Sequence, residues 1–213
     1  SPKRPFVAVV GGAKVSDKIA VIERFVQIAD QIIIGGAMAN TFLAHKGISV
    51  GASKVEADQK TVLNHIYAKA REKVGEEHVD EFIILPTDVA VADKIAPEAE
   101  RRVVSVSDIA PDDIVLDIGD QTIERVVDTV GPAKTVIWNG TLGYAEIPAF
   151  AHGSARLALA LASQPKTTSI IGGGDTADFV IKWDGNDGAS FTHVSTGGGA
   201  SLELMAGEHL PGV

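Results

Sequence analysis

Short apolar runs alternate along this chain with longer segments whose apolar positions recur at helical spacing. The runs are rich in Val and Ile and end at glycine or another turn-forming residue, which is typical of buried parallel strands. Strands are predicted at residues 6–10, 31–34, 82–85, 135–138, 167–171 and 193–194. Helices are predicted at residues 16–29, 37–46, 56–73, 121–130 and 149–163. A further helix is predicted to follow residues 172–176 and to run to about Trp183, and a last helix ends at Gly207.

The middle of the chain is patterned differently. Residues 89–92 and 114–118 are apolar, and a turn is predicted at 110–113. Residues 103–107 alternate between apolar and polar, as expected for a strand at a sheet edge or in a small appended ribbon. The elements of this region are therefore less clearly indicated than those on either side.

The unit of strand, glycine and helix recurs at least four times along the chain. This alternation predicts βαβ units and a parallel sheet covered by helices on both faces, which is a doubly wound, three-layer α/β/α fold of the Rossmann-like type. In such sheets the carboxyl ends of the strands gather at one edge, where ligands bind. Because each glycine cluster follows a strand, the clusters should converge on that edge.

Composition narrows the possible functions. The 213 residues suit a single domain, and 45% hydrophobic with only 5% aromatic residues predict a mostly aliphatic core. The net charge of -9 argues against nucleic acid or an anionic membrane as partner, so any anion site must be local. The absence of cysteine excludes disulfides and thiol catalysis and fits the reducing cytoplasm, where we expect the protein to work. No apolar run is long enough to span a membrane, and no signal peptide is recognisable.

The stretch from Val9 to Ile19 carries the strongest sign of chemistry. Two glycines follow the first strand, Ser16 can cap the next helix, and Lys14 and Lys18 lie at the amino end of that helix. Cations there are disfavoured by about 0.3–1 kcal/mol each, because the helix end already carries partial positive charge. Two solvated lysines are the simple alternative. We favour an anion site, such as one for phosphate, that uses both ammonium groups and the free N–H groups.

Four classes of phosphate-binding motif can be compared with the chain. A P-loop would need Gly-x4-Gly-Lys-Ser/Thr, and no such run exists. The dinucleotide-binding form Gly-x-Gly-x-x-Ala is matched by residues 172–177, but late in the chain and without an acidic residue about 20 positions later. The His-Arg-Asp and Asp-Phe-Gly motifs of protein kinases are absent. The fourth class is a nucleotide site built from several helix amino ends on one sheet.

Residues 172–176 suit this fourth class. Three glycines would let a phosphate approach the backbone, and Thr176 adds a hydroxyl. Asp175 beside a phosphate would be repelled unless a cation lay between them, so it is either a Mg²⁺ ligand or a cap of the following helix. The run from Thr196 to Ser201 is a second glycine nest, with a flexible linker as the alternative. Glu146 could bond ribose hydroxyls, although a surface glutamate is the simpler interpretation.

Five motifs follow one another across essentially the whole chain: GGAKVSDK at 11–18, IGGAM at 34–38, WNGTLG at 138–143 with Glu146, GGGDT at 172–176, and HVSTGGGASLE at 193–203. In order and spacing they resemble the carboxy-terminal half of the phosphoglycerate kinases, and the first and last motifs are together very specific. The resemblance implies one nucleotide-binding domain, residues 1–213, with a mainly parallel six-stranded sheet.

The resemblance also implies catalytic roles. Lys18 would contact the nucleotide phosphates, and Lys14 would stabilise the phosphoryl group in transfer. Gly197, Gly198 and Gly199 would receive that group. Mg²⁺ would be held by Asp175, with Asp17 approaching the metal in the ADP state.

A larger set would bind the nucleotide itself. Asn139 and Thr176 would hold phosphate oxygens and Glu146 the ribose, while Gly35 and Gly36 would floor the adenine pocket. The whole implied set is Gly11, Gly12, Ala13, Lys18, Gly35, Gly36, Asn139, Glu146, Gly173, Gly174, Asp175 and Thr176.

The chain departs from the pattern of the family on the adenosine side. Thr141 stands where proline is usual, Tyr144 and Ala145 where valine and phenylalanine are usual, and Val115 at a position that is commonly glycine. These departures bear on nucleotide affinity and base preference more than on phosphate chemistry. The amino-terminal domain of the family, which carries the phosphoglycerate site, has no counterpart in the 213 residues.

The reaction implied by the resemblance is reversible phosphoryl transfer from 1,3-bisphosphoglycerate to ADP in glycolysis. On its own the chain is expected to be a monomer that binds MgADP or MgATP without significant turnover, with the amino-terminal domain as its missing partner. Two alternatives from other classes stay open, an NAD(P)-binding oxidoreductase domain and a non-catalytic nucleotide-binding module. His193, within an apolar strand, is interpreted as a core histidine rather than a catalyst.

Overall fold

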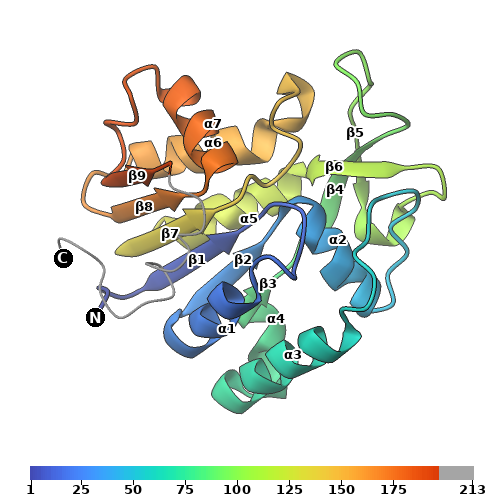
Figure 1. Cartoon of the computed structure of the whole chain (residues 1–213), viewed down its shortest axis with the longest axis horizontal. Coiled ribbons are helices and arrows are strands. Elements are labelled where there is room, and N and C mark those ends of the chain that lie inside the picture. Colours follow the sequence, from blue (N-terminus) through green and yellow to red (C-terminus); the bar gives the residue numbers. More distant parts are fainter. Residues whose placement is uncertain (197–213) are drawn as a thin grey trace.

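A six-stranded sheet, all of whose strands run parallel, forms the centre of the computed structural model, which describes residues 1–196 (Figure 1). The strand order is β3-β2-β1-β7-β8-β9, so the sheet grows outward from β1 in both directions, as the doubly wound prediction requires. The strands are β1 (Phe6–Val10), β2 (Gln31–Ile34), β3 (Ile83–Ile84), β7 (Thr135–Asn139), β8 (Thr168–Gly172) and β9 (His193–Ser195).

Helices cover both faces of this sheet, and the strand residues explain why. In β1, Phe6, Ala8 and Val10 are buried in one core, while Val7 and Val9 are buried in the other. Side chains alternate across a strand, so a continuously apolar strand needs cover on both sides. The first core is closed by α1 (Ile19–Ile28), α2 (Gly36–His45), α3 (Lys60–Val74) and α4 (Val79–Phe82), and the second by α5 (Asp120–Val130), α6 (His152–Ala162) and α7 (Gly174–Asp184).

The middle of the chain forms a separate small sheet with the strand order β5-β4-β6. Its strands are β4 (Asp88–Ala92), β5 (Arg102–Ser105) and β6 (Ile114–Ile118), and both pairs are antiparallel. The appended ribbon expected from residues 103–107 is therefore confirmed as β5. Short 3-10 helices span Glu76–His78, Val106–Asp108 and Pro148–Phe150.

Two buried carboxylates join the small sheet to the helices of the main sheet. Asp88, in β4, accepts hydrogen bonds from the backbone N–H groups of Gln121 (2.9 Å) and Thr122 (2.8 Å) at the start of α5. Asp117, in β6, accepts one from the N–H of Gly153 (3.2 Å) at the start of α6. Each carboxylate thus serves as an N-cap supplied by another element, because Gly119 and Ala151 at the true cap positions offer no side-chain oxygen.

Several predicted boundaries were wrong. Helix α1 begins at Ile19, with Lys18 at the N-cap position, and Ser16 does not cap it: the Ser16 hydroxyl donates to Glu56 instead. Helix α3 begins at Lys60 rather than 56, because the N–H of Glu56 donates to the Thr41 hydroxyl (3.0 Å) in the preceding loop.

Other predictions also differ from the structure. Phe82 closes α4 instead of opening a strand, and a 3-10 turn delays α6 until His152. His193 is exposed, so its interpretation as a core histidine was wrong. The helix predicted to end at Gly207 lies outside the described residues. Within the described residues, none of the helices combines the length and apolar character needed to cross a membrane.

Candidate functional site

Three loops that follow parallel strands meet at the carboxyl edge of the main sheet. The N–H of Gly11, after β1, donates to the carbonyl of Asn139 (2.8 Å), and that of Gly12 donates to the carbonyl of Thr141 (3.1 Å). The N–H of Gly36, after β2, donates to the carbonyl of Leu142 (3.1 Å). The predicted convergence of the glycine clusters is thus confirmed for these loops, which are tied to one another through their backbones.

Glycine is required at this junction because the backbones lie too close for a side chain. A Cβ on Gly11 would lie 2.2 Å from the carbonyl oxygen of Thr141. Gly36 has φ +65°, and a Cβ there would lie 2.6 Å from both the nitrogen and the oxygen of Gly12. Gly11 and Gly36 therefore hold the junction together, whatever they contribute to a ligand.

The ammonium group of Lys18 lies inside the same junction. It donates to the carbonyl of Gly11 (2.7 Å) and, at longer range, to that of Asn139 (3.3 Å). A Cβ on Gly12 or on Gly140 would lie 2.9 Å or 2.6 Å from its nitrogen, so these two glycines leave the room that the ammonium occupies. Burial lowers the pKa of Lys18 to about 8, and the nearby carboxylates of Asp17 and Asp175 offset part of that shift.

A half-buried cation held by neutral backbone carbonyls, with no carboxylate of the described residues bonded to it, is suited to receive an anion. An incoming phosphate would restore the favourable charge interactions that burial removes. The amino ends of α1 and α7 add partial positive charge at the same place. Lys14 lies in the loop before α1, is exposed, and makes no hydrogen bond or ion pair with any described residue. Its ammonium is therefore available to a ligand.

The amino end of α7 contributes polar groups that differ in their surroundings. Asp175 is exposed in the first turn of α7, and Gly174 has open space where a side chain would be. The Thr176 hydroxyl is buried and accepts a hydrogen bond from the N–H of Gly140 (2.7 Å), which ties α7 to the loop after β7. Asn139 is 2% exposed, and its Nδ2 has no hydrogen-bond partner among the described residues. A Cβ on Gly173 would lie 3.3 Å from that Nδ2, so the unpaired donor faces the glycine turn.

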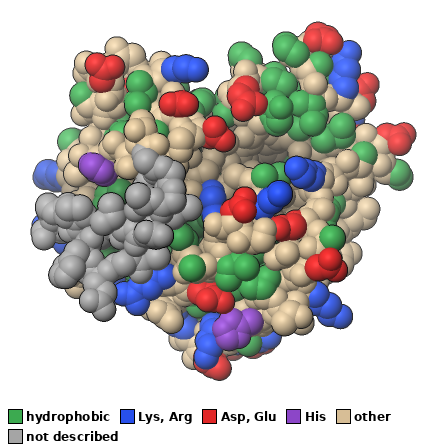
Figure 2. Space-filling model, in the orientation of Figure 1, with side chains coloured by type: hydrophobic (Ala, Val, Ile, Leu, Met, Phe, Trp, Pro, Cys, Tyr) green, Lys and Arg blue, Asp and Glu red, His purple; other side chains and the backbone are tan. Residues whose placement is uncertain are grey.

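A cleft of about 690 Å³ extends from this junction to the small sheet. Figure 2 shows the hollow between the region of α7 and the small sheet. We call its two sides the strand-end wall and the small-sheet wall. The strand-end wall includes Gly12, Ala13, Gly36, Asp175 and Lys182, and the small-sheet wall includes Ile95, Val115, Asp117, Tyr144 and Glu146.

The cleft brings together some of the predicted site residues and leaves others behind it. Gly12, Ala13, Gly36, Glu146 and Asp175 line it. Gly35 lies behind the Leu142 side chain, which a Cβ on Gly35 would approach to 2.5 Å. Asn139, Thr176 and Gly173 lie where α7 meets the loop after β7 rather than in the cleft lining, and Gly197, Gly198 and Gly199 lie outside the described residues. The role of each remains a prediction.

Sequence reasoning missed three polar residues of the cleft region. Asp117 lines the small-sheet wall, and Arg101 lies near it. Asn40, in α2, is 1% exposed and lines the cleft, and its Oδ1 has no partner among the described residues. A buried amide within an otherwise apolar helical stretch was the available signal for Asn40. Asp117 could have been found as the acidic residue inside the apolar run 114–118.

The acidic residues of the site fit a magnesium ion that arrives with a nucleotide. No cluster of three or more His, Asp or Glu residues that could cage a metal occurs in residues 1–196. Mg²⁺ in nucleotide sites needs only one or two protein carboxylates, because phosphate oxygens and water complete its shell. Asp175 and Asp17 are both exposed and both lie close enough to Lys18 to act on its charge. They could supply those carboxylates.

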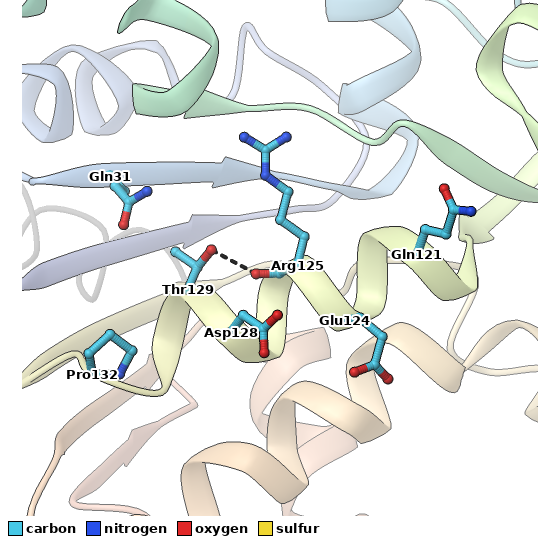
Figure 3. A pocket seen from close by; sticks show the side chains of 7 residues that line it. All are labelled: Gln31, Gln121, Glu124, Arg125, Asp128, Thr129 and Pro132. Atoms are coloured by element: carbon cyan, nitrogen blue, oxygen red, sulfur yellow. Dashed lines mark hydrogen bonds between the residues drawn. The ribbon is translucent and has the colours of Figure 1, made fainter.

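A second hollow, of about 580 Å³, runs along α5 on another part of the surface (Figure 3). It is lined by Gln31, Gln121, Glu124, Arg125, Asp128, Thr129 and Pro132. The Thr129 hydroxyl donates within the helix to the carbonyl of Arg125 (2.7 Å). None of these lining residues is a glycine, and Arg125, the cation among them, donates to the carbonyl of Asp80 rather than to a turn after a strand, so the chemistry of phosphate binding favours the cleft.

The family model described as phosphoglycerate kinase matches residues 1–208. The phosphoglycerate kinase of Desulfosudis oleivorans is 47% identical over 213 residues, which are 100% of this chain and 52% of that protein. The one from Chloroflexus aurantiacus is 47% identical over 215 residues with the same coverage. The solved structure of phosphoglycerate kinase from Coxiella burnetii superposes with a TM-score of 0.88 at 38% identity, covering 99% of this chain and 52% of that one. The chain thus spans about half the length of the curated relatives it matches.

Proposed function

The chain belongs to the phosphoglycerate kinase family, and from that premise we propose that its cleft binds ADP or ATP as the magnesium complex. The observation that carries the proposal is the Lys18 ammonium, half-buried among backbone carbonyls where the amino ends of α1 and α7 meet the cleft. Charge, free N–H groups and an exposed carboxylate for the metal occur there together. In this arrangement the phosphates lie at Lys18 and α7, and the adenosine extends toward the small-sheet wall.

We infer that the parent reaction is phosphoryl transfer between 1,3-bisphosphoglycerate and ADP. The attacking and leaving groups are both anions, so the residues must position them and neutralise charge rather than remove a proton. Lys18 would hold the nucleotide phosphates. Lys14, which is exposed and unpaired among the described residues, would stabilise the charge of the phosphoryl group during its transfer. The glycine nest at Gly197, Gly198 and Gly199 would receive that group. Such a glycolytic role would place the protein in the cytoplasm.

We further propose that the 213-residue chain alone binds nucleotide without significant turnover. Its cleft offers cations and free N–H groups on the nucleotide side. A two-substrate transfer also depends on a site that holds the phosphoglycerate in line, an advantage worth about 7–11 kcal/mol of barrier. In the family that site belongs to the amino-terminal domain. Substantial ATP formation by the chain alone, in a coupled assay with 1,3-bisphosphoglycerate, would overturn this part of the proposal.

The decisive experiment is calorimetry with MgADP, with NADH as the competing ligand. We expect a single site for MgADP of micromolar to millimolar affinity and no binding of NADH. Binding of NADH instead would favour the oxidoreductase alternative, and failure of both ligands would reject a nucleotide site. A monomer by light scattering is expected throughout.

The metal is tested by Asp175→Asn, which keeps the shape and helix-capping ability of the side chain but removes its charge. If Asp175 serves Mg²⁺, the variant should lose affinity for MgADP while its affinity for metal-free ADP stays the same or rises. Equal losses for the two forms would reduce Asp175 to a helix cap. Asp178, one turn further along α7, offers Asp178→Asn as a control for the general loss of negative charge.

A further inference from the structure

We propose that Asp117 is a positioning residue, which sets nucleotide affinity by holding the cleft loop Gly143–Glu146 against β6 and the amino end of α6. The proposal rests on the nucleotide site proposed above and adds a residue that no part of that proposal uses. Asp117 lies in β6, and the loop that it would hold carries Tyr144 and Glu146, both of which line the cleft.

The carboxylate of Asp117 is enclosed by the backbone of two other elements. Its Oδ2 accepts from the N–H of Gly153 (3.2 Å) in α6, and its Oδ1 accepts from the N–H of Ile118 (2.9 Å). A Cβ on Gly143 would lie 2.5 Å from Oδ1, and a Cβ on Gly153 would lie 2.8 Å from it. Glycine at both positions therefore lets the loop and the helix close onto the carboxylate, which leaves Asp117 only 2% exposed.

Strand β6 also binds the loop directly, through Leu116, the residue before Asp117. The N–H of Tyr144 donates to the carbonyl of Leu116 (2.7 Å), and the N–H of Ile147 donates back to the carbonyl of Tyr144 (3.1 Å). The loop therefore keeps its path only while β6, Gly143 and α6 stay in register. Displacing the Asp117 carboxylate would shift Tyr144 and Glu146 together, because both follow Gly143 within three residues.

The charge of this carboxylate depends on its neighbours from three elements. Arg101, just before β5, lies near it and donates to the ring Nδ1 of His152 in α6 (3.2 Å), and its guanidinium lies 3.5 Å from the carboxylate of Asp120 in α5. Burial raises the pKa of Asp117 to about 7, and the N–H groups around it and Arg101 oppose that shift. The carboxylate therefore gains and loses a proton near neutral pH, whereas burial and Arg101 lower the pKa of His152.

Protonation should favour the closed loop, because the packing of Gly143 and Gly153 buries the carboxylate and burial favours the neutral acid. The ionised carboxylate accepts stronger hydrogen bonds from the N–H groups of Gly153 and Ile118, but these only partly offset the cost of burying its charge. Asp117→Asn resembles the neutral acid in shape and charge. The variant should therefore match the wild-type chain where Asp117 is protonated and differ from it where Asp117 is ionised.

The test compares Asp117→Asn with Asp88→Asn by calorimetry with MgADP at about pH 6 and about pH 8. Asp88 is the matched control, because it caps α5 from the same small sheet but does not contact the loop Gly143–Glu146. At about pH 8, where ionisation of Asp117 loosens the loop of the wild-type chain, Asp117→Asn should bind about tenfold more tightly than wild type, the scale known for residues that act through a packed network. At about pH 6 the two should converge, and Asp88→Asn should follow wild type at both values.

A second measurement follows the loop without a ligand. At about pH 8, amide hydrogen exchange of Tyr144 should be slower in Asp117→Asn than in wild type and unchanged in Asp88→Asn. Gly143→Ala, which pushes the loop away from Asp117 without altering any charge, should weaken MgADP binding at both pH values.

The outcomes separate this inference from the proposed function. If wild type binds no MgADP, the proposed function fails, while the exchange rate of Tyr144 still decides whether Asp117 holds the loop. Equal changes of affinity in Asp117→Asn and Asp88→Asn, or a difference from wild type that is the same at the two pH values, would overturn the positioning role. Unchanged affinity and unchanged exchange in Asp117→Asn would overturn it as well.

Discussion

The strand-end wall of the cleft is held together by backbone hydrogen bonds, whereas the small-sheet wall is held by buried carboxylates. On the first wall, the loops after β1, β2 and β7 exchange N–H and carbonyl groups directly, and glycine makes that approach possible. On the second, Asp88 and Asp117 reach from the small sheet to cap α5 and α6. The stability of the first wall should therefore depend on the close approach of its backbones, and that of the second should also depend on the ionisation of Asp117.

The two walls also present different chemical groups to a ligand. The strand-end wall presents Lys18 and the amino ends of two helices, groups that recognise phosphate in any nucleotide. The small-sheet wall presents Ile95, Val115 and Tyr144, whose apolar surface suits a base or ribose. Ile95 is 51% exposed and Tyr144 is 41% exposed, so both offer apolar surface that a ligand could cover. In the proposed nucleotide complex, affinity for phosphate and selection of the base would thus be controlled by different parts of the fold.

The largest expected effect comes from adding one methyl group to the strand-end wall. Gly36→Ala forces a side chain into φ +65° and places its Cβ 2.6 Å from the backbone of Gly12. Strain in the left-handed region and overpacking against backbone should together lower the free energy of unfolding by about 3–5 kcal/mol. Urea denaturation of the variant and the wild-type chain measures this.

Gly47→Ala is the control for the backbone strain alone. Gly47 has φ +85° but open space where a Cβ would be, so this variant should cost only about 1–2 kcal/mol. Similar costs for the two variants would mean that the junction of loops adapts, and the contrast between the walls would lose its main support.

The next effect is a dependence of the unfolding free energy on pH that comes from the small-sheet wall. The pKa of Asp117 is about 7 in the folded chain and near 3.8 when unfolded, so the folded state binds the proton more tightly. Its contribution to stability is complete below about pH 4, falls as the pH rises toward 7, and is constant above that. The difference in unfolding free energy between wild type and Asp117→Asn should fall by up to about 1.4 kcal/mol per pH unit in that window.

Chemical denaturation at several pH values measures that slope. Gly36→Ala should show the same slope as wild type, because it alters only the strand-end wall. A difference between wild type and Asp117→Asn that is constant with pH would mean that the carboxylate stays ionised throughout.

A third effect separates the two lysines of the strand-end wall. Lys18→Ala should weaken MgADP binding by about 1.5–3 kcal/mol, the scale of a hydrogen bond to a charged group. Lys14→Ala should weaken it less, because Lys14 is proposed to act on the phosphoryl group in transfer rather than on the bound nucleotide. Calorimetry gives both values, and circular dichroism checks the fold. Equal losses would reject this division of roles.

The parts of the strand-end wall could be predicted from the sequence because each is a local run of strand, glycine turn and helix, as within residues 6–28. The recurrence of that unit along the chain already implied that the sheet is covered on both faces. The errors arose where distant partners decided the outcome. The carboxylate of Glu56 accepts a hydrogen bond from the Ser16 hydroxyl and its N–H donates to the Thr41 hydroxyl, so Glu56 does not begin a helix. Phe82 is the last residue of α4 rather than the first of a strand.

The small-sheet wall could not be predicted in the same way. Asp117 and Gly153 are 36 residues apart, and Arg101 and His152 are 51 apart. Neither pair has a spacing that a helix or strand period would reveal. Local periodicity fixes which face of an element is buried, but it does not say which buried carboxylate caps which helix.

The smallest expected effect is the uptake of a proton when the strand-end wall receives its ligand. The pKa of Lys18 is about 8 in the free chain, so near that pH its amine is about half protonated. Phosphate beside the amine favours the charged form and raises its pKa. Binding of preformed MgADP at about pH 8 should therefore take up as much as about half a proton per site. Calorimetry in two buffers with different heats of ionisation measures the number directly.

Lys18→Arg is the control for this measurement, because a guanidinium stays charged at any accessible pH and can still meet a phosphate. Uptake should vanish in this variant even if MgADP binds. At about pH 8 Asp117 is mostly ionised, so the small-sheet wall contributes little to the proton count. Uptake that persists in Lys18→Arg would have to come from another group, and Lys18 would then be no more than a structural tie between the carbonyls of Gly11 and Asn139.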